Sequence, residues 1–196
     1  NWLHDAHDHA STTAGDTLTV YTENEATSNI ASTTVDKGPF ISVTANSDIF
    51  TTDGQYVGFY AYLTSGLNRG KYYLIIDSAS TTDSFSLNVS STTGLNPGDA
   101  FTIVDRIYTK DSGYTGSCTA GTGSYNLCLT KDGTAAGGPI TWNASGTVIL
   151  DAENTRADVI FGYRADHNII DGFVVMNGTS DGVQLDSTSD HTVVRS

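Results

Sequence analysis

Short apolar runs separated by polar turns fill this chain, and two stretches near its end share one pattern. With an offset of 24 residues, 158–172 lies over 182–196 without a gap, and each copy reads as a β run, a polar Asp-His turn and a second β run. A repeat of this length built from short strands predicts a solenoid, because one unit alone cannot bury its apolar face. The apolar positions expected in one shared core are Val159, Phe161, Ile170, Phe173, Val183, Leu185 and Val194.

The beginning of the chain has helical rather than strand-like spacing. Trp2, Leu3, Ala6 and Ala10 fall on one side of a helix over 1–11. We expect this helix to cap the first turn of the solenoid, whose backbone groups and apolar core would otherwise be open.

Three histidines also lie in this predicted helix. His4 and His7 share a face, but His9 points nearly opposite, so a zinc site is less expected there than a solvated face.

The middle of the chain changes in character. Aromatic-rich strands separated by Gly, Asn and Ser turns run from 40 to 105, which predicts a compact antiparallel β module. We therefore divide the chain into a cap helix with a first strand (1–39), an inserted module (40–105) and parallel β-helix coils (106–196). The alternative is two successive domains.

Composition narrows the function and the location. Nine Lys and Arg stand against 22 Asp and Glu, a formal charge of −13, which excludes nucleic acid and anionic membranes as partners. No apolar run is long enough for membrane insertion. Cys118 and Cys128 flank a Gly/Ser loop, and a disulfide between them would suit an extracellular protein, the alternative being two unpaired thiols.

Two segments carry a resemblance to a known family. DGTAAGGPITWNASGTVILDA (132–152) and DHNIIDGFVVMNGTSDGVQLDSTSDHTVVRS (166–196) resemble right-handed parallel β-helix proteins of the pectate-lyase-like superfamily. The resemblance covers about 97–196. It implies an all-β fold, a short right-handed parallel β-helix, to which the capping helix and the inserted antiparallel module are added. It does not imply one activity, because the superfamily includes lyases, hydrolases, epimerases, phage tailspikes and surface fibres.

The two Asp-His turns hold the candidate functional residues. Enzymes of this superfamily hold Ca²⁺ with carboxylates or use Asp residues on adjacent coils, and stacked strands are about 4.8 Å apart. Asp166 and Asp190 are therefore candidate Ca²⁺ ligands, and with His167 and His191 they are candidate catalytic residues. Asp is equally an ordinary turn residue, and no hydrolase or lyase signature is present.

These observations favour a structural role over an enzymatic one. We expect an exported subunit of a fibre, sheath or virion appendage that forms homo-oligomers or filaments, because the strand at 192–195 exposes backbone groups that another chain can pair with. The alternative is a polysaccharide lyase or glycoside hydrolase, or the N-terminal part of one, acting on acidic glycans through an Asp cluster.

Overall fold

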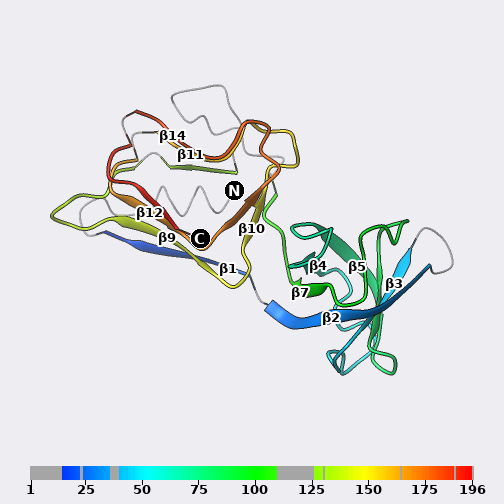
Figure 1. Ribbon diagram of the computed structural model, residues 1–196. Coiled ribbons are helices and arrows are strands. Elements are labelled where there is room, and N and C mark those ends of the chain that lie inside the picture. Colours follow the sequence, from blue (N-terminus) through cyan, green and yellow to red (C-terminus); the bar gives the residue numbers. More distant parts are fainter. Residues whose placement is uncertain are drawn as a thin grey trace. The chain divides into compact units, whose positions relative to one another are not determined.

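The computed structural model describes residues 15–22, 24–35, 40–109, 126–129, 131–163, 165–187 and 189–195, and all regular elements in these ranges are β-strands. The chain divides into two compact units (Figure 1). One unit, called here the parallel unit, consists of Asn1–Thr22 with Ile107–Ser196, and the other, the barrel unit, is Glu23–Arg106.

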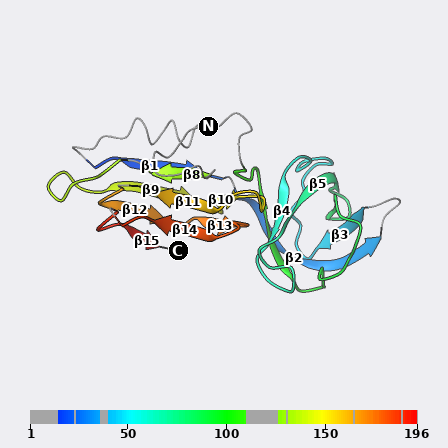
Figure 2. The same cartoon turned by 90° about the horizontal axis from the view of Figure 1, so that it is seen from above.

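The parallel unit contains three sheets in which every strand pairing is parallel. One sheet has the order β1-β9-β12-β15, the second is β10-β13, and the third is β14-β11-β8 (Figure 2). The strands are β1 (Thr17–Tyr21), β8 (Leu127–Leu129), β9 (Ile140–Ser145), β10 (Ile149–Asp151), β11 (Asp158–Gly162), β12 (Asn168–Asp171), β13 (Val174–Met176), β14 (Asp181–Leu185) and β15 (Val193–Arg195).

The register between the two sequence copies is not uniform. Ile170 of β12 pairs with Val194 of β15, which is the offset of 24 residues read from the sequence. In β11 and β14, however, Ile160 pairs with Val183, an offset of 23. The connection from β14 to β15 therefore holds one residue more than the connection from β11 to β12. The gapless alignment had matched Val159 with Val183, and one extra turn residue is enough to shift that match.

The core of the parallel unit is mainly aliphatic around one tryptophan. Trp142 of β9 is fully buried, and Val159 and Ile170 belong to the same cluster. Phe161 lies in a separate small cluster with Cys128. Val194 was also expected in the core, and it is 49% exposed.

The barrel unit is a closed antiparallel sheet with the order β2-β3-β6-β5-β4-β7. Its strands are β2 (Asn24–Val35), β3 (Ile41–Ala45), β4 (Tyr60–Leu63), β5 (Tyr72–Ala79), β6 (Ser84–Leu87) and β7 (Ala100–Val104). Strand β2 closes the barrel because it pairs with β7 along its first half and with β3 along its second half, with a register shift in each pairing. Its long curved path is visible in Figure 1.

Aromatic side chains fill the centre of the barrel. Phe50, Phe85 and Phe101 are each at most 2% exposed, and the ring centroids of Phe85 and Phe101 are 5.2 Å apart. The antiparallel module predicted from the sequence starts at residue 40, whereas this unit starts at Glu23 and includes β2.

The expected fold class, a short right-handed parallel β-helix with an N-terminal capping helix, is wrong as a description of this chain. The strands form a closed six-stranded antiparallel barrel and three separate small sheets, and no helix occurs among the described residues. The predicted helix over 1–11 lies outside those residues. Short apolar runs between polar turns are common to many all-β arrangements, and two repeat copies are fewer than a solenoid assignment needs.

Candidate functional site

The structure brings together three of the four residues singled out in the Asp-His turns. The Nδ1 atom of His167 is 3.1 Å from Oδ2 of Asp166, and Nδ1 of His191 is 3.3 Å from Oδ1 of the same carboxylate. The two imidazole rings are stacked, with centroids 4.6 Å apart and an interplanar angle of 23°. These three residues are called the Asp-His cluster below.

Asp190 does not join this cluster through its carboxylate. Its backbone carbonyl accepts a hydrogen bond from the backbone N–H of His167 at 3.1 Å, and its side chain is exposed. The expected pairing of the Asp166 and Asp190 carboxylates around Ca²⁺ therefore has no counterpart in the described contacts. The imidazole of His191 occupies the place beside Asp166.

Both histidines are held by an unusual backbone conformation. His167 has a φ of 51° and His191 a φ of 55°, in the left-handed region that His tolerates better than most residues. His167 precedes β12 and His191 lies shortly before β15, so equivalent turns on successive parallel strands place one ring over the other.

Hydrogen bonds between the two turns hold them in register. The backbone N–H of Ala165 donates to Oγ of Ser189 at 3.2 Å, and this hydroxyl donates to the carbonyl of Gly162 at 3.0 Å. The hydroxyl of Thr192 donates to the carbonyl of Ala165.

A third turn supports the cluster from the side of β9. The backbone N–H of Asp166 donates to Oδ1 of Asp132 at 2.8 Å, and the N–H of Gly133 donates to the Asp166 carbonyl at 2.9 Å. A Cβ at Gly133 would lie 2.4 Å from the His167 carbonyl oxygen, so this close approach requires glycine. Neither Asp132 nor Gly133 was predicted from the sequence to support the site. The signal that could have identified them is the Asp-Gly turn ahead of the Pro-Ile-Thr strand.

The surroundings of the Asp166 carboxyl group stabilise its charged form. Burial alone would raise its pKa, but the backbone N–H of His167 and both imidazoles act in the opposite direction and hold the pKa below its usual value. Asp166 is therefore a carboxylate that accepts from several donors, and the Asp-His cluster presents one oxygen ligand and two nitrogen ligands within 4.8 Å of one another.

A second carboxyl pair lies on β11 and β14, where Asp158 is the register partner of Asp181. Asp158 is 2% exposed, and burial, together with the nearby charge of Asp181, raises its pKa. A hydrogen bond from the backbone of Asp181 acts in the opposite direction. These two residues are 23 positions apart, so the sequence alignment with an offset of 24 residues did not match them.

A buried guanidinium is the main polar feature inside the parallel unit. Arg156 is 1% exposed, and its Nη1 donates to Oδ1 of Asn126 at 2.7 Å. The Asn126 amide in turn donates to the carbonyls of Tyr108 and Asp151 at 3.0 and 2.8 Å. This network fixes loops to strands and presents no surface to a ligand.

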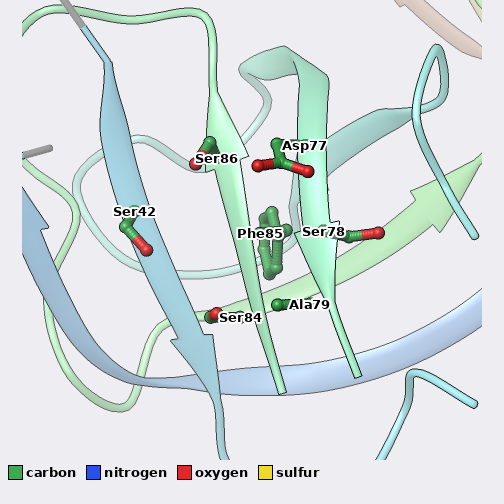
Figure 3. A pocket seen from close by; sticks show the side chains of 7 residues that line it. All are labelled: Ser42, Asp77, Ser78, Ala79, Ser84, Phe85 and Ser86. Atoms are coloured by element: carbon green, nitrogen blue, oxygen red, sulfur yellow. The ribbon is translucent and has the colours of Figure 1, made fainter. Parts of the chain in front are cut away.

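A polar hollow is present on the barrel, over the register shift between β5 and β6 (Figure 3). Hydroxyl groups and one carboxylate line it, which suits hydrogen bonding to a small polar molecule. The lining residues are Ser42, Asp77, Ser78, Ala79, Ser84, Phe85 and Ser86.

The predicted disulfide joins Cys118 to Cys128, and only the second of these residues is described by the structure. Cys128 is buried in β8, and Cys118 lies outside the described residues, so no cysteine pair is seen among them. No helix in the described part of the chain has the length and apolarity needed to cross a membrane.

Comparison of the chain with family models, curated proteins and solved structures gives no match in any of the three. The resemblance to pectate-lyase-like proteins therefore stays a prediction from the quoted motifs. It brings no activity to this chain.

Proposed function

We propose that this chain is a structural subunit of an exported assembly, such as a fibre, sheath or virion appendage, whose copies associate through the edges of their parallel sheets. The observation that supports this proposal is the set of strands β13, β14 and β15, each of which is the terminal strand of its own sheet. Terminal strands present backbone N–H and C=O groups on which another strand can pair.

Strand β15 is the best candidate for such an edge. Its three residues are exposed, and Val193 and Val194 are 41% and 49% accessible. Exposed apolar side chains on an edge strand favour association with another strand. The opposite edge of the same sheet is β1, where Tyr21 is 51% exposed. A second copy that adds its β1 to β15 continues the parallel sheet in a head-to-tail contact, and such contacts propagate into filaments unless they close into rings.

The charge of the chain fits an exported assembly with salt-dependent contacts. Copies with a formal charge of −13 repel one another, and added salt screens this repulsion. Association through backbone pairing and valine burial should therefore strengthen as the salt concentration rises.

Sedimentation velocity tests the proposal at tens of micromolar chain and at low and high salt. Concentration-dependent association is expected, and Val194→Lys should abolish it because a charge on an edge strand opposes pairing. Val57→Lys is the matched control, since Val57 is 47% exposed, lies outside the named strands and takes the same change in charge. A chain that remains monomeric at every concentration and salt level contradicts the proposal, and so does equal loss of association in both variants.

A second candidate function has one observation in its favour. A lyase or hydrolase acting on acidic glycans needs carboxyl groups with different proton affinities, and the raised pKa of Asp158 beside Asp181 fits that requirement. The 2% exposure of Asp158 leaves little of it accessible to a sugar, which is why the structural role is preferred. Release of reducing ends from an acidic polysaccharide, lost in Asp158→Asn, would favour the enzyme instead.

A further inference from the structure

The Asp-His cluster has the composition of a transition-metal site. Two imidazole nitrogens and one carboxylate oxygen converge, whereas Ca²⁺ takes six to eight oxygen ligands. Nitrogen donors of this kind suit Zn²⁺, Ni²⁺, Co²⁺ and Cu²⁺. The donor chemistry therefore points away from the calcium ion expected from the sequence.

The separations between donor atoms fit one such ion. Ligands bonded to Zn²⁺ at about 2.0–2.1 Å in a tetrahedron lie roughly 3.4 Å from one another. The Nδ1 atom of His167 is 3.1 Å from Oδ2 of Asp166, the Nδ1 atom of His191 is 3.3 Å from Oδ1, and the three ligand atoms lie within 4.8 Å of one another, so rotation of the side chains can bring them to one ion. An ion at this position replaces the protons through which the imidazoles now contact the carboxylate.

The cluster is also organised in advance. The left-handed conformation of both histidines, the N–H of His167 on the Asp166 carboxylate at 2.9 Å and the support from Asp132 fix the directions of the ligands. Fixed ligands favour binding because little conformational freedom is lost when the ion arrives. The His191 side chain is 70% exposed, which leaves coordination positions open to water.

We propose that Asp166, His167 and His191 form a binding site for one divalent transition ion of the Zn²⁺ type, completed by water. The ion ties the turn before β12 to the turn before β15, and so joins two successive parallel strands at the edge of their sheet. The site does not depend on the assembly proposed above, because all three ligands come from one chain.

The test uses the full chain in which His4, His7 and His9 are replaced by Gln, so that the Asp-His cluster holds both remaining histidines of the five. Titration calorimetry with Zn²⁺ should show saturable binding of one ion per chain. Co²⁺ should give a visible absorption band, and Zn²⁺ but not Ca²⁺ should raise the melting temperature because the ion binds the folded state. Binding should weaken below about pH 6, since imidazole must be neutral to coordinate.

Single substitutions distinguish Zn²⁺ binding at the Asp-His cluster from non-specific binding by the acidic surface. His167→Asn and His191→Asn keep a residue that accepts positive φ, and each should weaken Zn²⁺ binding at least about tenfold, as should Asp166→Asn. Asp190→Asn is the matched control, because it removes a carboxylate that lies in the same turn as His191 but outside the Asp-His cluster. This variant should keep the wild-type affinity for Zn²⁺.

Three results would overturn the proposal. They are absence of saturable Zn²⁺ binding to the background protein, equal affinity for Ca²⁺, and a loss in Asp190→Asn as large as that in Asp166→Asn. Circular dichroism of each variant without metal establishes that it is folded, and His191→Asn provides the safest variant because that side chain is largely exposed.

Discussion

The two units of this chain use β-strands in opposite ways. In the barrel unit every strand pairs on both sides, because β2 reaches from β7 to β3 and closes the sheet. In the parallel unit the sheets stay open, and β13, β14 and β15 end them. Closure removes the edges on which another chain can pair, so the barrel is suited to independent folding and the parallel unit to association.

Their interiors differ as well. The barrel buries a group of phenylalanines with ring contacts of 5.2–5.8 Å between Phe85 and its neighbours Phe101 and Phe50. The parallel unit buries aliphatic side chains, Trp142 and the guanidinium of Arg156. The interior of the parallel unit therefore includes a buried charge that needs hydrogen-bond partners, here Asn126.

The largest effects are expected when each core is truncated. Phe101→Ala in the barrel and Trp142→Ala in the parallel unit should each destabilise their own unit by about 3–5 kcal/mol, because each removes a buried aromatic ring and leaves a cavity. Hydrogen exchange measured on peptides should show loss of protection confined to the mutated unit, since the two core clusters share no residue. Equal loss in both units would show that the chain unfolds as one cooperative body.

A smaller effect is expected from the polar network of the parallel unit. Asn126→Ala removes the acceptor of the Arg156 guanidinium and the donor to two carbonyls, and it should cost about 2–3 kcal/mol in denaturant unfolding. Arg156→Met removes the buried charge together with its need for a partner, and should cost less than Asn126→Ala. A larger cost for Arg156→Met would mean that the guanidinium itself stabilises this core.

The smallest effects concern pH, and they have opposite signs in the two units. Burial raises the pKa of Asp158, so the folded parallel unit holds this proton more tightly and loses stability as pH rises through the folded pKa. In the barrel, the backbone N–H and the hydroxyl of Ser80 bond to Oδ1 of Asp53 at 2.8 and 2.9 Å and lower its pKa. The stability that Asp53 contributes to the barrel is present above the usual pKa of Asp, and it disappears as the pH falls through the lower pKa of the folded state.

Melting curves at pH 3 and pH 7 check both signs. Asp158→Asn should raise the melting temperature at pH 7 and have little effect at pH 3, whereas Asp53→Asn should lower it slightly at pH 7 only. A stabilising Asp53→Asn, or a destabilising Asp158→Asn at pH 7, would contradict the assignment for that residue.

Some of this arrangement could be predicted from the sequence, for reasons visible in particular residues. Aromatic strands separated by turn residues indicated the antiparallel module, and the repeated Asp-His turn indicated that His167 and His191 occupy equivalent positions. Strand β2 could not be recognised in the same way, because its sequence NEATSNIASTTV is mostly polar and its two register shifts interrupt any alternation.

The limits of the site prediction have a similar origin. A repeat states which residues are equivalent, but it does not state which side chains turn toward each other. The turn geometry directs His191, rather than the carboxylate of Asp190, toward Asp166. The extra residue in the last turn shifted the pairing that joins Asp158 to Asp181, and support from Asp132 depended on a turn far away in the sequence.

Asn24 at the start of β2 pairs with Val104 at the end of β7, so the chain enters and leaves the barrel at neighbouring points. Antiparallel partners lie about 5 Å apart at their Cα atoms, a gap that a two-residue turn bridges. The barrel unit can therefore be inserted, removed or replaced as one segment without a change in the strand order of the parallel unit. Evolution can alter what such a chain displays while leaving the parallel sheets and their turns untouched.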